Sequence, residues 1–180
     1  MRKVLAVLAV VALVLAIAVP APAEDGDLEY LVKDKDVVKV FVKDFTNESG
    51  QAQVSSADFK KELEKALTLR KAVKFEIVSN PEASDFQIGG VIKNYMYSKT
   101  DPITPTTSPA ALVLDAATTE NYVEMTVDFE VVQTKNGKAV WQEDVKSYLK
   151  HTMTPEEALP MIYDKEARTF LWKSFGKPNR

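Results

Sequence analysis

The stretch NYVEMTVDFEVVQT, residues 121–134, decides the fold, because apolar and polar side chains alternate along it from Tyr122 to Val131. The apolar set consists of Val123, Met125, Val127, Phe129 and Val131, and the polar set between them of Tyr122, Glu124, Thr126, Asp128 and Glu130. A strand with this period of two has one packed and one wet face. We therefore expect an antiparallel sheet that helices cover on one side.

Four further segments read as strands. Asn136-Gly137 fits a type I′ hairpin turn, so residues 138–150 should return beside residues 121–134. Upstream, the β-branched and alternating segments are residues 36–45, 73–79 and 86–99. Gly89 and Gly90 interrupt the last of these and predict a bulge or a close approach of two backbones.

Two helices are predicted from their caps and apolar stripes. Ser55 or Ser56 can cap the first, whose buried stripe would be Phe59, Leu63, Ala66 and Leu67. Thr154 to Glu157 forms a capping box with proline at the first helical position, so a second helix should begin there. Pro160 should kink or restart that helix, and Gly176 should end it.

This order of elements predicts an α+β fold, a mostly antiparallel sheet of about five strands with two helices packed on one face. We expect a single domain at residues 37–176, which includes a long loop at 100–120. A flexible lead-in at 24–36 would precede it, and a short tail at 177–180 would follow it.

Residues 1–23 have the parts of a cleaved export signal. Arg2 and Lys3 supply the positive start, Val4 to Val19 is apolar, and Ala21-Pro22-Ala23 is a small-x-small cleavage site. The alternative is an uncleaved anchor, but the apolar run is shorter than the roughly 20 residues of a membrane-spanning helix. No later segment is apolar enough to cross a bilayer. We expect an exported protein that resides in the periplasm, either free or bound peripherally to the outer membrane.

Composition excludes several kinds of chemistry. The chain has no cysteine, which excludes disulfides, thiolate metal sites and an acylated N-terminal cysteine. The net charge is −3, and loss of Arg2 and Lys3 with the signal would make it −5, so nucleic acid is not an expected partner.

No catalytic constellation stands out either. His151, the single histidine, lacks a nucleophile motif around it. A catalytic acid–base pair could be sought among Glu124, Asp128 and Glu130. A solvated sheet face, with Lys146 as a neighbour, is the preferred interpretation of these carboxylates. We expect no enzyme, no cofactor and no metal.

Two features remain as candidate binding sites. The long loop contains an apolar run that either tucks onto the sheet or contacts a partner: Ala110, Ala111, Leu112, Val113 and Leu114. The first helix carries Lys60, Lys61 and Lys65, which could contact a lipid or another anion. Glu62 and Glu64 are interleaved with these lysines, so an ordinary solvated helix face is the preferred interpretation.

Several short motifs resemble the LptE family of lipopolysaccharide-assembly proteins. They are Phe45-Thr46-Asn47 after the first strand, NPEASD at 80–85, NGKAVW at 136–141 and YDKEA at 163–167. Lipoproteins of the curli-secretion and penicillin-binding-protein activator types are rivals, since they share the opening and the hairpin.

The LptE resemblance implies a non-enzymatic partner of an outer-membrane β-barrel, LptD-like, that also contacts lipopolysaccharide or lipid. The lipidated cysteine of the family is missing here. The alternatives are a periplasmic carrier of a lipid or small ligand, and a regulator of an envelope complex with a related fold.

Overall fold

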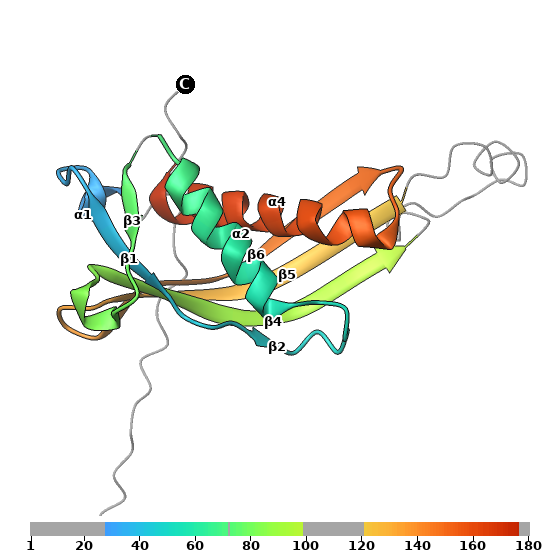
Figure 1. The fold of residues 1–180 in the computed structure, drawn as a ribbon, viewed down its shortest axis with the longest axis horizontal. Coiled ribbons are helices and arrows are strands. Elements are labelled where there is room, and N and C mark those ends of the chain that lie inside the picture. The colour runs from blue at the N-terminus through green and yellow to red at the C-terminus, as the bar shows by residue number, and fades with distance from the viewer. Residues whose placement is uncertain (1–27, 72, 99–120, 177–180) are drawn as a thin grey trace, which may run out of the picture.

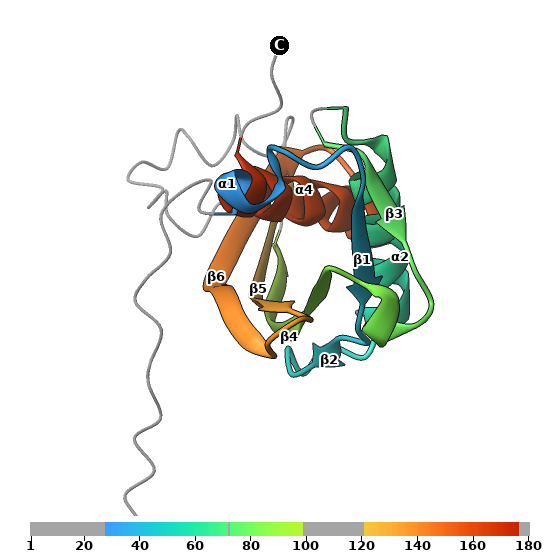
Figure 2. The same cartoon turned by 90° about the vertical axis from the view of Figure 1, so that its left-hand side faces the viewer.

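The computed structural model describes residues 28–71, 73–98 and 121–176. Helices α2 (Ser56–Leu69) and α4 (Pro155–Phe175) lie together on one face of a single sheet (Figure 1). Seen end-on, the sheet curves around the two helices, with α4 nearer β6 and α2 nearer β1 (Figure 2). The α+β class and the helices on one face, which the sequence predicted, are confirmed.

The sheet is mixed. Its strands are β1 (Val38–Val42), β2 (Thr46–Asn47), β3 (Phe75–Ile77), β4 (Phe86–Ser98), β5 (Asn121–Gln133) and β6 (Lys138–His151). The order is β3-β1-β4-β5-β6, and β2 also pairs with β4. The long β4–β5 and β5–β6 ladders are antiparallel, but β1 is parallel to both β3 and β4. Helix α2 forms the crossover between β1 and β3, as a parallel pair requires.

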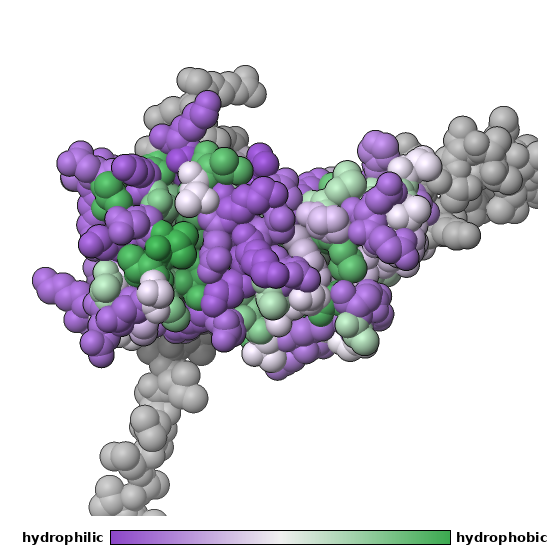
Figure 3. Space-filling view, in the orientation of Figure 1, coloured by the Kyte–Doolittle hydropathy of each residue, from purple (hydrophilic) through white to green (hydrophobic). Residues whose placement is uncertain are grey.

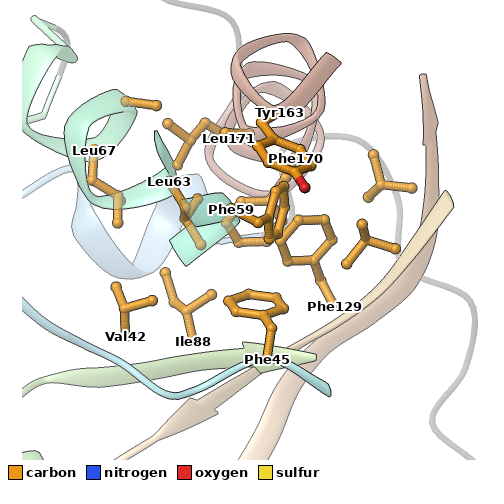
Figure 4. Packing of buried hydrophobic residues seen from close by; sticks show 14 of the residues in the cluster. Val42, Phe45, Phe59, Leu63, Leu67, Ile88, Phe129, Tyr163, Phe170 and Leu171 are labelled. Atoms are coloured by element: carbon orange, nitrogen blue, oxygen red, sulfur yellow. The ribbon is translucent and has the colours of Figure 1, made fainter. Parts of the chain in front are cut away.

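A cluster of aromatic rings joins the sheet to both helices (Figure 4). The rings of Phe129 on β5 and Phe170 on α4 stack with centroids 4.2 Å apart. Phe59 on α2 lies 5.9 Å from Phe129 and 5.0 Å from Phe45, centroid to centroid. The predicted α2 stripe is confirmed, because its buried residues are Phe59, Leu63, Ala66 and Leu67.

Helix α4 begins at the predicted capping box. Thr154 accepts a hydrogen bond from the Glu157 backbone N–H, and the Glu157 carboxylate accepts one from the Thr154 backbone N–H. The helix runs unbroken past Pro160, so the predicted restart does not occur. Gly176 follows the last residue with φ +78°, where glycine costs least.

The lead-in differs from the expected flexible segment. Its described part forms the short helix α1 (Glu29–Val32), in which Val32 is only 1 % exposed, as is Leu28 just before it. The Leu28 backbone N–H donates to the carbonyl of Ser174 at 2.8 Å. Leu28 and Val32 thus anchor this segment, with Leu31 also packed against the core.

The hairpin also differs from expectation. Gln133 pairs with Lys138, so the connection is residues 134–137. A type I′ turn needs positive φ at both central residues, but only Gly137 has it, at +66°. Asn136 instead accepts a hydrogen bond from the Lys138 backbone N–H through its side chain. The predicted type I′ turn is therefore wrong.

Gly90 is where two backbones approach closely, as the sequence predicted. A Cβ atom there would lie 2.1 Å from the carbonyl oxygen of Asp128 on β5. The irregularity in the β4–β5 ladder lies further along, between Ile92 and Asn94. At Gly89 an added Cβ would meet only the Lys43 side chain, 3.1 Å from its Cδ and 3.2 Å from its Cβ.

We predict that Gly90→Ala destabilises the protein far more than Gly89→Ala. The first change pushes a methyl group into the backbone of β5, at a cost of roughly 3 kcal/mol. The second makes a tight contact with the Lys43 side chain, which must shift by a few tenths of an ångström, and costs about 1 kcal/mol. Urea denaturation of both variants checks this. Equal losses would show that the approach at Gly90 is not a constraint.

Candidate functional site

A groove of about 430 Å³ lies where α4 runs beside strand β6, and we name it the α4–β6 groove. Its lining residues are Leu149, Met161, Asp164, Lys165, Arg168, Thr169 and Trp172. All but Leu149 belong to α4, and Leu149 belongs to β6. The groove is therefore built by one helix and one edge of the sheet.

Exposed apolar side chains gather around this groove. Among the described residues five large hydrophobic side chains are exposed, and two of them line the groove: Met161 at 42 % and Trp172 at 43 %. The face in Figure 3, which carries α2, is largely hydrophilic apart from a hydrophobic area over β1 and β3. Concentrated exposed apolar surface is typical of interaction sites.

Charged side chains are interleaved with the apolar ones. Asp164 and Arg168 form an ion pair one helical turn apart, with the Arg168 Nε 2.8 Å from the carboxylate. Lys165 reaches across the edge of β6, where its Nζ donates to the carbonyl of Tyr148 and lies 5.0 Å from the centroid of the tyrosine ring. Lys165 thus covers one point of the edge strand β6. Lysine side chains commonly protect such edges from pairing with another strand.

A buried carboxyl group lies close to the floor of the groove. The Thr169 hydroxyl at the floor is 3.0 Å from the Ser147 hydroxyl of β6. Glu166, on the same helix, is 0 % exposed, and neither carboxyl oxygen has a hydrogen bond of good geometry. Burial raises the pKa of Glu166 to about 8, although Ser147, the Val127 backbone and Lys173 each act to lower it.

Glu166 is therefore held as a neutral acid at pH 7. An ionised carboxylate at this position would lack the solvation it has in water, and that cost favours the protonated form. Lys173, a positive charge that acts on this carboxyl group, is paired with Glu143 of β6. Sequence reasoning missed this buried acid, because Glu166 stands among the charged residues of YDKEA and only the packing of α4 shows which of them faces inward.

The carboxylates weighed from the sequence lie on the outer face of the sheet. Glu124 is 2.9 Å from Lys146, as expected, and accepts a hydrogen bond from the Tyr122 hydroxyl. Asp128 lies 3.2 Å from the Nζ of Lys93. His151 is exposed, and its Nδ1 contacts the carbonyl of the next residue.

The three lysines of α2 are each ion-paired. Lys60 pairs with Asp44 at 2.8 Å, Lys61 with Asp58 at 2.9 Å and Lys65 with Glu62 at 2.9 Å. This arrangement fits the solvated face preferred from the sequence. Contact of these lysines with a lipid or anion stays a prediction without support from their surroundings.

Three expectations fall outside the described residues. They are the export signal at 1–23, the long loop at 100–120 with its apolar run from Ala110 to Leu114, and the tail at 177–180. Within the described ranges, no helix is long and apolar enough to cross a membrane.

No family model and no curated protein matches the chain. Among solved structures, a variant of the PelC dodecamer from Paraburkholderia phytofirmans is similar, with 16% identity and a TM-score of 0.50 over 76% of this chain and 87% of that chain. A minor lipoprotein from Acinetobacter baumannii has 13% identity and a TM-score of 0.42 over 79% of this chain and 94% of that one. At such identities the PelC likeness shows a shared fold alone, and the lower score carries no argument.

These findings correct the family resemblance. The similar structure whose score supports a shared fold is PelC and not an LptE protein, so the LptE resemblance is wrong. Two of the four motifs behind it describe local turns. NPEASD forms the 3₁₀ turn η1 (Pro81–Ala83), which Asn80 caps, and NGKAVW contains the end of the hairpin loop. Turn residues are selected by backbone conformation, so they recur in unrelated families.

We predict that Glu166→Gln removes part of the pH dependence of stability. The folded pKa lies above the unfolded value of 4.5, so the folded state keeps a proton that the unfolded chain releases. Between those two pKa values this group should lower the free energy of unfolding by roughly 1.4 kcal/mol per pH unit as the pH rises. Below the unfolded pKa the effect vanishes.

Thermal or urea unfolding from pH 4 to 9 measures this difference. The Glu166→Gln variant should gain stability over wild type as the pH rises, and Glu76→Gln, on an exposed position of β3, should show no such gain. Parallel pH profiles for wild type and Glu166→Gln would mean that Glu166 is not held neutral.

Proposed function

We propose that this chain is an exported, non-enzymatic component of the bacterial envelope that works by associating with copies of itself, with the α4–β6 groove in the contact. The observation that carries the proposal is the presence of two exposed apolar side chains, Met161 and Trp172, in the lining of this groove. Export rests on the signal predicted at residues 1–23.

The packing between helices and sheet favours a surface contact over ligand carriage. The carrier alternative needs space between the two layers. At the centre of that region the rings of Phe45, Phe59, Phe129 and Phe170 touch one another instead. An apolar ligand there would have to displace close-packed side chains, which costs several kcal/mol.

Two observations support the non-enzymatic part. The carboxylates Glu124 and Asp128 are engaged in ion pairs on the outer side of the sheet, and Glu124 is only 8 % exposed. Glu166, the acid whose pKa is most altered, is fully buried and cannot meet a substrate without a rearrangement of α4. Neither arrangement matches an exposed acid–base pair.

Self-association is favoured over a different partner because the similar PelC structure is a dodecamer. That likeness concerns the fold, so an assembly of this chain is our proposal. The β-barrel partner and lipopolysaccharide rested on the LptE resemblance and are not retained.

We expect the protein expressed from the full chain to sediment as an oligomer in analytical ultracentrifugation between about 1 and 100 μM. Met161→Glu should shift it toward the monomer, because a charge would then be buried in the contact. Leu69→Glu is the matched control, since Leu69 is an exposed apolar residue at the end of α2, away from the groove lining. A wild-type protein that stays monomeric throughout would refute the proposal.

A further inference from the structure

Strand β6 presents a long open edge. It stands at one end of the strand order and has 14 residues, and no other described strand pairs with its outer side. The opposite edge of the sheet, β3, has only 3 residues. A long edge is a template for pairing with another strand, so most proteins protect it.

The geometry shows which residues face that edge. The Tyr148 carbonyl receives the Lys165 side chain, which comes from α4 and not from the sheet. Carbonyls in an antiparallel strand alternate in direction, so Asp144 and Lys146 turn their backbone groups to the same edge as Tyr148. The β-bulge lies at the hairpin end of β6, between the pairs Val131–Trp141 and Val132–Ala139. Residues 142–148 are therefore regular and available.

We propose that two copies of this chain pair their β6 strands antiparallel about a two-fold axis at Val145, so that Asp144 of each copy lies opposite Lys146 of the other. The inference rests on the proposed self-association and specifies its surface. The two sheets then form one continuous sheet, an isologous contact.

Charge favours this register over the two that are shifted by one residue. A two-fold axis at Asp144 would set two aspartates directly opposite each other, and an axis at Lys146 would set two lysines opposite, both unfavourable. An axis at Val145 makes two opposite-charge pairs and places Gln142 opposite Tyr148. Asp144 and Lys146 already contact Lys93 and Glu124, but both side chains remain 56% exposed and can take a second partner.

The same register brings the Trp172 ends of the two grooves together. A two-fold axis perpendicular to the sheet keeps both helix layers on one side, so the α4 helices run antiparallel next to each other. Thr169 lies beside Ser147, and Lys173 pairs with Glu143, so this part of α4 spans the level of Val145. Trp172 is thus close to the axis. Lys165 need not block the pairing, because a carbonyl oxygen has two acceptor sites.

Reversing the charges tests the register. Asp144→Lys alone and Lys146→Asp alone each place like charges at both contact points, so each variant should lose the contact and show at least a two-fold lower assembly mass than wild type. An equimolar mixture restores an opposite-charge pair at both points and should recover the mass. Glu130→Lys, on the outer face of β5, is a control for charge change and should assemble as wild type does.

Crosslinking through introduced cysteines gives a second test of the register. It does not depend on the charge-reversal variants, so it stands even if those variants are less stable. The chain has no cysteine of its own. Asp144→Cys mixed with Lys146→Cys should form an intermolecular disulfide under mild oxidation, because directly opposite residues have Cα atoms about 5.5 Å apart. Neither variant should crosslink efficiently by itself.

The outcomes separate the two proposals. Three results would each overturn the β6 register and leave self-association standing. The charge variants could both assemble as wild type does, or their mixture could fail to recover the assembly mass. The disulfide could also form equally well in the unmixed cysteine variants. A monomeric wild type would remove the proposed function as well.

Discussion

The stack between Phe129 and Phe170 is the contact on which the rest of the structure depends. Phe129 is on β5, the strand between β4 and β6, and its ring also meets Phe45 and Phe59. Phe170 in turn meets Trp141 of β6. One pair of rings therefore fixes α4 over β5 and β6. With α4 in that place, its outer side and the open edge of β6 become the two walls of the groove.

Arg70 fixes the far end of the same helix. Its guanidinium donates to the carbonyls of Leu171, Phe175 and Gly176 at 2.6 to 2.7 Å. The last carbonyls of a helix have no partner within it, so these bonds from the end of α2 satisfy them. Burial lowers the pKa of Arg70 and Glu29 acts to raise it, yet a guanidinium stays charged at any ordinary pH. The two helices thus hold each other in register along the sheet.

The groove combines features that oppose one another, and this balance suits a reversible contact. Exposed Met161 and Trp172 favour association, whereas Lys165 over the edge of β6 limits uncontrolled strand pairing. Beneath them Glu166 is a buried acid without a good hydrogen bond. Burying its carboxyl group is unfavourable, and the packing of the surrounding side chains offsets that free energy. The alternating charges of β6 then restrict which register an approaching strand can adopt.

The sequence by itself determined the local elements and their buried faces. The alternation at 121–134, the stripe of α2 and the capping box at Thr154 each depend on residues near in the chain. Only the tertiary structure decided the parallel place of β1 between β3 and β4, the anchoring of α1, the burial of Glu166 and the groove beside β6. Periodicity tells which side of an element is buried, but not what it packs against, because that depends on contacts between residues far apart in the chain.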